Sequence, residues 1–182
     1  MSMDAIEDEI YPSFVFLPVL DLKQEQSEWC WAATTMNIVH FYNADSQWTQ
    51  CSLVNRALSR HDCCDDSSGS DLQVCTDCNK PGYPDHALEW TGHYKSIVAG
   101  KPSLGLLMSE LSRQRPVSIA IHWRTGGYHN VAIIGYDNSD PLRPTIDIAD
   151  PLFGPSTCDF QSFPENYIGR HAIWIRSYLT IQ

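Results

Sequence analysis

The chain has 182 residues, of which 43% are hydrophobic and 19% charged, a composition that supports one folded domain with a buried core. The formal net charge of −10 argues against nucleic acid and anionic membrane surfaces as partners. No stretch is apolar and long enough to cross a bilayer, and the acidic residues 1–10 lack the order of a signal peptide. Export would therefore need another route, or a leader that has already been removed.

The first part of the chain predicts a short extended segment followed by two helices. Residues 13–20 predict a strand or arm, in which Pro18 disfavours a central position in a sheet. Residues 30–43 predict a helix that is apolar on every face, which is typical of a buried helix. An alanine pair in its first turn would let neighbouring elements approach closely. A second helix is expected over residues 47–58.

Residues 59–84 predict a long polar loop that is rich in cysteine. A loop of this length in a compact domain needs tethering, and the cysteines besides Cys30 are Cys51, Cys63, Cys64, Cys75, Cys78 and Cys158. We expect disulfides rather than zinc or free thiols, because the adjacent Cys63 and Cys64 cannot easily bind one tetrahedral ion together. The spacing leaves the pairing open, and Cys158 either stays unpaired or joins the loop. Disulfides would indicate an oxidising compartment.

The second half of the chain predicts two more helices and then a sheet. The helices are expected at residues 84–94 and 103–114, with Ser103 as the N-cap of the latter. After Pro116 the pattern changes to strands, at residues 117–123, 129–137, 145–149 and 171–179. Helices followed by an antiparallel sheet predict the α+β class.

Cys30 lies at the predicted start of the buried helix, where the positive end of the helix dipole favours a thiolate. A thiolate is the nucleophile that acyl-transfer chemistry needs. Gln24 lies six residues earlier, and its side-chain amide together with the backbone N–H of Cys30 would form an oxyanion hole. Gln26 is a weaker alternative to Gln24, because the six-residue offset favours the latter.

His129 and Asp150 are the candidate base and orienting acid. His129 follows a glycine pair at the mouth of an apolar strand, where it would be held rigidly yet face a cleft. Asp150 ends the next predicted strand and would accept the second N–H of the imidazole ring. Asp147 is a rival three residues earlier, although the two would point to opposite faces of a strand. His122 is the alternative base.

Taken together, these motifs resemble the papain-like cysteine peptidases. The resemblance covers about residues 20–155 and extends to bacterial double-glycine leader peptidases and to the effector cysteine peptidases of plant pathogens. Its elements are the Gln24-to-Cys30 spacing, Trp29-Cys30-Trp31-Ala32-Ala33, Gly127-Tyr128-His129 leading to Gly135-Tyr136, and Asp150-Pro151. The sequence departs from the plant papain pattern by having aspartate where asparagine is usual.

The resemblance implies a papain-like fold for residues 1–182, in which a helical half (about 20–115) carries Cys30 on a buried central helix and packs on an antiparallel sheet half (116–182). It implies a thiol endopeptidase in which Cys30 is the nucleophile, His129 the base and then acid, Asp150 the orienter and Gln24 the oxyanion donor. A deamidase, transglutaminase or acyltransferase with the same residues is an alternative. A non-enzymatic binding module, stabilised by disulfides or zinc, is another.

Several expectations about partners follow. We expect a protein or peptide substrate, a cognate inhibitor or immunity protein, and no nucleic acid or membrane partner. The chain is expected to act as a monomer without cofactor or bound metal. We further expect a secreted or translocated bacterial protein that serves as an effector or toxin. Substrate preference is not readable from the sequence, because the loops that would set it cannot be positioned.

Overall fold

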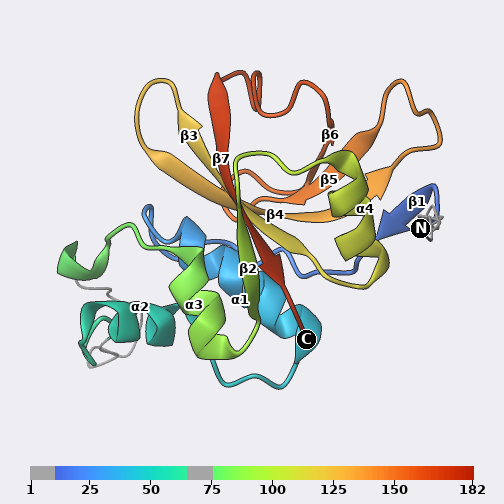
Figure 1. The fold of residues 1–182 in the computed structure, drawn as a ribbon. Coiled ribbons are helices and arrows are strands. Elements are labelled where there is room, and N and C mark those ends of the chain that lie inside the picture. The colour runs from blue at the N-terminus through green and yellow to red at the C-terminus, as the bar shows by residue number, and fades with distance from the viewer. Residues whose placement is uncertain (1–10, 65–75) are drawn as a thin grey trace, which may run out of the picture.

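The computed structural model describes residues 11–64 and 76–182, which form helices packed against one antiparallel sheet (Figure 1). The α+β class predicted from the sequence is confirmed. The strands are β1 (Phe14–Phe16), β2 (Tyr94–Ala99), β3 (Val117–Trp123), β4 (Tyr128–Asp137), β5 (Thr145–Ala149), β6 (Ser156–Asp159) and β7 (Ala172–Thr180). The helices are α1 (Cys30–Tyr42), α2 (Gln50–Leu58), α3 (Pro84–Thr91) and α4 (Leu104–Ser112), with a 3₁₀ turn at Thr76–Cys78. No described helix has the length and apolar character of a membrane span.

The sheet runs in the order β2-β7-β3-β4-β5-β6, and β1 pairs with the far end of β4. The strands predicted after Pro116 are confirmed as β3, β4, β5 and β7. The sequence does not predict β2 and β6, which form the two edges of the sheet. Edge strands are short and partly polar, so their apolar pattern is weak. Because β2 lies within residues 20–115, part of the segment expected to be helical joins the sheet.

Local caps explain where the helices begin and end. α2 begins at Gln50, later than expected, because Thr49 and Ser52 form a capping box. α3 ends before Gly92, which has a φ of +84° and acts as a left-handed C-cap, so the predicted helix was too long. Ser103 caps α4 as predicted, since its side chain accepts a hydrogen bond from Leu106 N–H.

The central strands bury both faces, and each face carries its own cluster of side chains. In β4, Val131 and Ile133 join the larger core, which α4 covers with Leu107 and Leu111. The alternate residues of the central strands face α1, and several of them are small: Ala120, Ala132 and Ala149. Small side chains let the helix lie close to the sheet. α1 is accordingly buried along almost its whole length, as predicted for an all-round apolar helix.

A third cluster lies beneath the cysteine-rich segment and joins α1, α2 and α3. Two disulfides hold this region together, Cys51–Cys64 and Cys63–Cys78. The expectation of disulfides is confirmed for these four residues. Asp62, Cys63 and Cys78 lie close enough together to hold a metal ion, but the two sulfurs of this group are bonded to each other in the second disulfide. Of the described cysteines, Cys30 and Cys158 have free thiols. Cys75, on which part of the expectation fell, lies outside the described residues.

Candidate active site

Cys30 is the first residue of α1, as predicted, and 8% of its surface is exposed. Trp29 supplies no side-chain cap, so the amides of the first turn direct the positive end of the helix toward the sulfur. The flanking indoles fix the helix start. Trp29 Nε1 donates to the carbonyl of Cys78 at 2.9 Å, and Trp31 Nε1 donates to that of Lys80 at 3.3 Å.

His129 lies near the start of β4 and Asp150 directly after β5, and both are almost completely buried. Nε2 of the ring lies 2.9 Å from each carboxylate oxygen of Asp150. Nδ1 is therefore the nitrogen left for the thiol of Cys30, and the two groups lie close enough for each to shift the pKa of the other. The structure thus brings together Cys30, His129 and Asp150, which we call the triad.

The environment of the triad favours three charged groups. Burial alone would raise the pKa of the Cys30 thiol, but the hydrogen bond and charge of His129, with contacts from Asn130, bring that pKa below its ordinary value. Burial alone would lower the pKa of His129, but Asp150 and Cys30 raise it to about 9. Burial would raise the pKa of Asp150, yet His129 and further donors lower it. The arrangement therefore stabilises a thiolate, an imidazolium and a carboxylate.

Asp150 accepts further hydrogen bonds from donors other than His129. The backbone N–H groups of Leu152 and Phe153 donate to its Oδ1 at 2.8 and 2.9 Å. The hydroxyl of Tyr167 donates to its Oδ2 at 2.7 Å. The sequence does not predict a role for Tyr167, because this residue lies in an irregular segment between β6 and β7 with no motif of its own.

Gln24 lies in the segment before α1, where its backbone N–H donates to the carbonyl of Pro151 at 3.0 Å. Its side-chain nitrogen donates to the carbonyls of Gln26 and Ser27, both at 2.8 Å, and its Oε1 is buried without a partner. Both amide hydrogens thus point to local carbonyls rather than to the sulfur. The oxyanion role of Gln24 stays a prediction, and it requires one of these hydrogens to be shared with a substrate.

Comparison with known families places this site in a peptidase class. The profile of the Peptidase C39 like family matches residues 16–173. The chain belongs to this family. Its fold is that of papain-like cysteine proteases, and the predicted resemblance to them is confirmed. A comparison with curated protein sequences finds no match.

Solved structures of papain-like proteases share the fold of this Peptidase C39 like chain. The proform of the ragweed pollen allergen Amb a 11 cysteine protease is 14% identical, with a TM-score of 0.57 over 97% of this chain and 67% of that one. Bromelain from Ananas comosus, in complex with the E64 inhibitor, is 13% identical, with a TM-score of 0.53 over 94% and 100%. Xylellain, a cysteine protease from Xylella fastidiosa, is 12% identical, with a TM-score of 0.51 over 95% and 88%.

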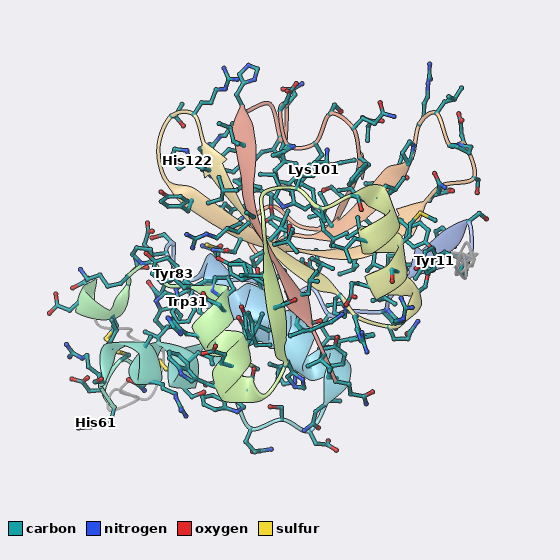
Figure 2. All side chains as sticks on the ribbon, in the orientation of Figure 1. Tyr11, Trp31, His61, Tyr83, Lys101 and His122 are labelled. Atoms are coloured by element: carbon teal, nitrogen blue, oxygen red, sulfur yellow. A yellow bond between two sulfur atoms is a disulfide. The ribbon has the colours of Figure 1, made fainter. Side chains whose placement is uncertain are left out.

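A pocket of about 340 Å³ opens beside Cys30 in this C39-like peptidase. Trp31, Gly82 and Tyr83 line its helical side, whereas Tyr128 and Tyr178 line its sheet side. Figure 2 shows Trp31 and Tyr83 close together on the helical side of the molecule. A Cβ at Gly82 would lie 2.4 Å from Cε2 of Trp31, so the backbone of this wall packs directly on the indole ring.

The wall that contains Gly82 is tied to the segment before the nucleophile. Asn79 accepts a hydrogen bond from Glu28 N–H and donates one to the hydroxyl of Ser27, both at 2.9 Å. The Cys63–Cys78 disulfide anchors the same wall from the other side. The cysteine-rich region therefore helps to shape the pocket beside the sulfur.

Asn130, which the sequence motifs do not predict as a site residue, contacts Sγ of Cys30 directly. Its side-chain nitrogen donates to Sγ of Cys30 at 3.5 Å, and 4% of its surface is exposed. Its Oδ1 is buried and has no hydrogen-bond partner among the described residues. Strand alternation places Asn130 on the same face of β4 as Ala132 and Ile134, which pack on α1, but the sequence does not show which face of the strand meets the helix.

The rival residues have other contacts. Asp147 on β5 accepts a hydrogen bond from the hydroxyl of Thr157 on β6 at 2.6 Å. The ring of His122 packs on Tyr128 with a centroid distance of 4.8 Å, and Figure 2 shows it on the sheet side, away from the helices. Among the described residues, His129 is the histidine that Cys30 contacts and Asp150 is the acid that His129 contacts.

Proposed function

We propose that this chain is a thiol endopeptidase that hydrolyses peptide bonds in a protein substrate. The observation that carries the proposal is the buried ring of His129, which is hydrogen-bonded to Asp150 through Nε2 and interacts with the Cys30 thiol. An imidazole in this position can take the thiol proton, keep its own orientation, and later give the proton to a leaving amine.

The chemistry runs in two halves. The thiolate of Cys30 attacks a peptide carbonyl carbon, and the imidazolium of His129 protonates the nitrogen of the breaking C–N bond, which leaves a thioester on Cys30. In the second half His129 takes a proton from water and the resulting hydroxide attacks the thioester carbonyl. The C–S bond then breaks, which releases the carboxylic acid product, and His129 returns its proton to the sulfur. Asp150 stays ionised throughout and holds the ring.

Charge develops on the carbonyl oxygen in each half, and the start of α1 is the place where that oxygen would lie. The N–H of Cys30 is a first-turn amide without an intrahelical acceptor, and Gln24 is the proposed second donor. Each donor of this kind is worth about 3 kcal/mol in the transition state. A substrate carbonyl would compete with the carbonyls of Gln26 and Ser27 for the Gln24 amide.

The biological setting is part of the proposal. The disulfides Cys51–Cys64 and Cys63–Cys78 support passage through an oxidising compartment. We propose a secreted or translocated effector or toxin, with a protein substrate and a cognate inhibitor or immunity protein. The pocket beside Cys30, with its three tyrosines, supports recognition of a substrate side chain of substantial size.

The test compares the wild type with Cys30→Ala in the same proteome digest, read by mass spectrometry of new N-termini. We expect cleavages that only the wild type makes, with a narrow sequence preference. Labelling by a thiol-reactive epoxide should occur at Cys30 and not at Cys158. New N-termini in neither sample, combined with labelling and with ammonia release from glutamine-containing proteins, would contradict hydrolysis of peptide bonds and indicate a deamidase or transferase.

A further inference from the structure

The phenol of Tyr167 is a second side-chain donor to Asp150, besides the ring of His129. Its hydroxyl lies 2.7 Å from Oδ2 of Asp150, and 3% of the residue is exposed. We propose that Tyr167 is a positioning residue of the triad, which holds Asp150 ionised and oriented toward the imidazolium of His129. The inference rests on the proposed peptidase chemistry.

The Tyr167 hydroxyl acts at the carboxylate as a hydrogen-bond donor to Oδ2. Oδ1 of Asp150 already accepts from two backbone N–H groups, and both oxygens lie within reach of Nε2 of His129. The phenol supplies the additional donor for Oδ2 and so prevents rotation of the carboxylate. A hydrogen bond to the charged form of an acid favours that form. Consistent with this, Tyr167 is among the groups that lower the pKa of Asp150, while burial and Asp150 raise the pKa of the phenol.

Tyr167 is held in place by aromatic rings that also contact the triad. Its ring is parallel to that of Trp123, with an interplanar angle of 2° and a centroid distance of 6.3 Å. Trp123 stacks in turn on the ring of His129 at 6.0 Å. Phe163 packs against Tyr167 edge to face at 5.1 Å. One indole therefore sets the spacing between the imidazole and the phenol that share Asp150.

The irregular segment that carries Tyr167 is fixed at its start by Lys101. The ammonium group of Lys101 donates to the carbonyls of Phe160, Gln161 and Phe163, and it lies over the rings of Phe160 and Trp174. Figure 2 shows Lys101 on the sheet side of the molecule, away from α1, α2 and α3. Lys101 thus fixes the position of a segment that has neither helix nor strand. Tyr167 needs such a fixed position if it is to orient a catalytic group.

Few charged or titratable groups face this end of the site. His129 contacts Asp150 from β4, and Cys158 and Ser156 on β6 act on the Tyr167 hydroxyl. Arg170 lies over the rings of Trp123 and Phe153 at 5.7 and 5.8 Å. In the described part of the chain the carboxylate thus has one cationic contact, the imidazolium. Loss of a neutral hydrogen-bond donor should therefore change the pKa of Asp150 measurably.

The experiment compares Tyr167→Phe with Tyr136→Phe. Tyr136 is a matched control, because it is fully buried in the same core and its hydroxyl bonds the carbonyl of Pro12 at 2.6 Å and Ser112 at 3.0 Å, not the triad. The readouts are the pKa of the Asp150 carboxyl by ¹³C NMR, assigned with Asp150→Asn, and kcat and KM for a cleaved peptide as a function of pH. Thermal unfolding is measured for both variants.

Tyr167→Phe should raise the pKa of Asp150 by about one unit, because a hydrogen bond to an ionised group has been lost. It should lower kcat about tenfold with KM unchanged, and move the acidic limb of the profile upward. Tyr136→Phe should lose similar stability without these changes. An unchanged Asp150 pKa in Tyr167→Phe, or equal shifts in both variants, would overturn the inference. If the protein cleaves no peptide but Tyr167→Phe still shifts the pKa of Asp150, the proposed function would be wrong and the role of Tyr167 at the carboxylate would stand.

Discussion

The two ends of the triad are held in opposite ways. Asp150 is fully buried and accepts hydrogen bonds from a ring, a phenol and two backbone amides. Cys30 lies beside a pocket, is 8% exposed, and is contacted by one side-chain amide besides the ring. The same imidazole therefore has a rigid partner on one side and an accessible one on the other.

This difference follows the chemistry expected at each end. The sulfur must accept and release an acyl group, so it needs open space and few fixed contacts. The carboxylate does not change its covalent state, and its value lies in being in place before the substrate arrives. Substitutions at the two ends should therefore separate loss of activity from loss of stability.

Replacement of the nucleophile should give the largest effect on activity and the smallest on stability. Cys30→Ala removes the thiolate, so the rate of peptide hydrolysis should fall by a factor on the order of a million. Alanine has a high helix propensity and differs from cysteine by one sulfur atom, so the midpoint of chemical denaturation should stay close to the wild-type value. Residual turnover above a hundredth of the wild-type rate would mean that another group is the nucleophile.

Removal of the carboxylate should damage both properties. Asp150→Ala leaves the Nε2–H of His129, the Tyr167 hydroxyl and two backbone amides without their acceptor. We expect kcat to fall by a factor on the order of a thousand and the free energy of unfolding to drop by about 3–5 kcal/mol.

Two variants sharpen that result. Asp150→Asn should recover part of the activity, because an amide oxygen can still accept from Nε2. Asp147→Ala removes an acid whose contact is Thr157, so its activity should stay within a factor of two or so of wild type. A loss in Asp147→Ala as large as in Asp150→Ala would reverse our assignment of the orienting acid.

Much of this arrangement was predictable from the sequence, and the reasons are physical. The all-round apolar helix, the strand that carries His129 and the strand that ends before Asp150 have strong local patterns, and all three are found in the structure. Tyr167 could not be predicted, because its position depends on Lys101 and Trp123, which are distant in the sequence. The disulfide pairing was also open, since spacing alone does not choose partners.

The pocket wall offers a test of the open end. Gly82→Ala would place a Cβ 2.4 Å from the Trp31 ring, so the wall must move away from the indole. We expect KM for a peptide to rise about tenfold, with a stability loss of about 1–3 kcal/mol from overpacking. Gly105→Ala is the matched control, because nothing lies within 4 Å of the added Cβ and the site is in α4. Equal effects of the two variants would show that the wall does not contact substrate.

The pH dependence should report the shared imidazole. The raised pKa of about 9 for His129 means that the ring keeps its proton, and can protonate a leaving amine, until the pH passes that value. We expect kcat/KM to decline above pH 9 or so. The stability that the charged ring contributes is present below its unfolded pKa, about 6.5, and is lost as the pH rises through 9 or so. Kinetics and chemical denaturation over pH 6–10 would check both, and a decline centred near 6.5 would contradict a stabilised imidazolium.

Loss of the amide at the sulfur end should have the smallest effect, because the ring of His129 remains. Asn130→Leu keeps the volume but removes the donor at 3.5 Å from Sγ, so the pKa of the Cys30 thiol should rise by about half a unit to one unit. The acidic limb of Cys30 alkylation by iodoacetamide, followed by mass spectrometry of the labelled peptide, should move upward by the same amount. Asn37→Leu is the control. Asn37 is also a buried asparagine, but it lies on α1 and is hydrogen-bonded to the backbone of Leu22 rather than to the sulfur, so this variant should leave the limb in place. If the limb does not move in Asn130→Leu, the thiolate is held by His129 and the helix alone, and the contrast between the two ends is greater than the contacts indicate.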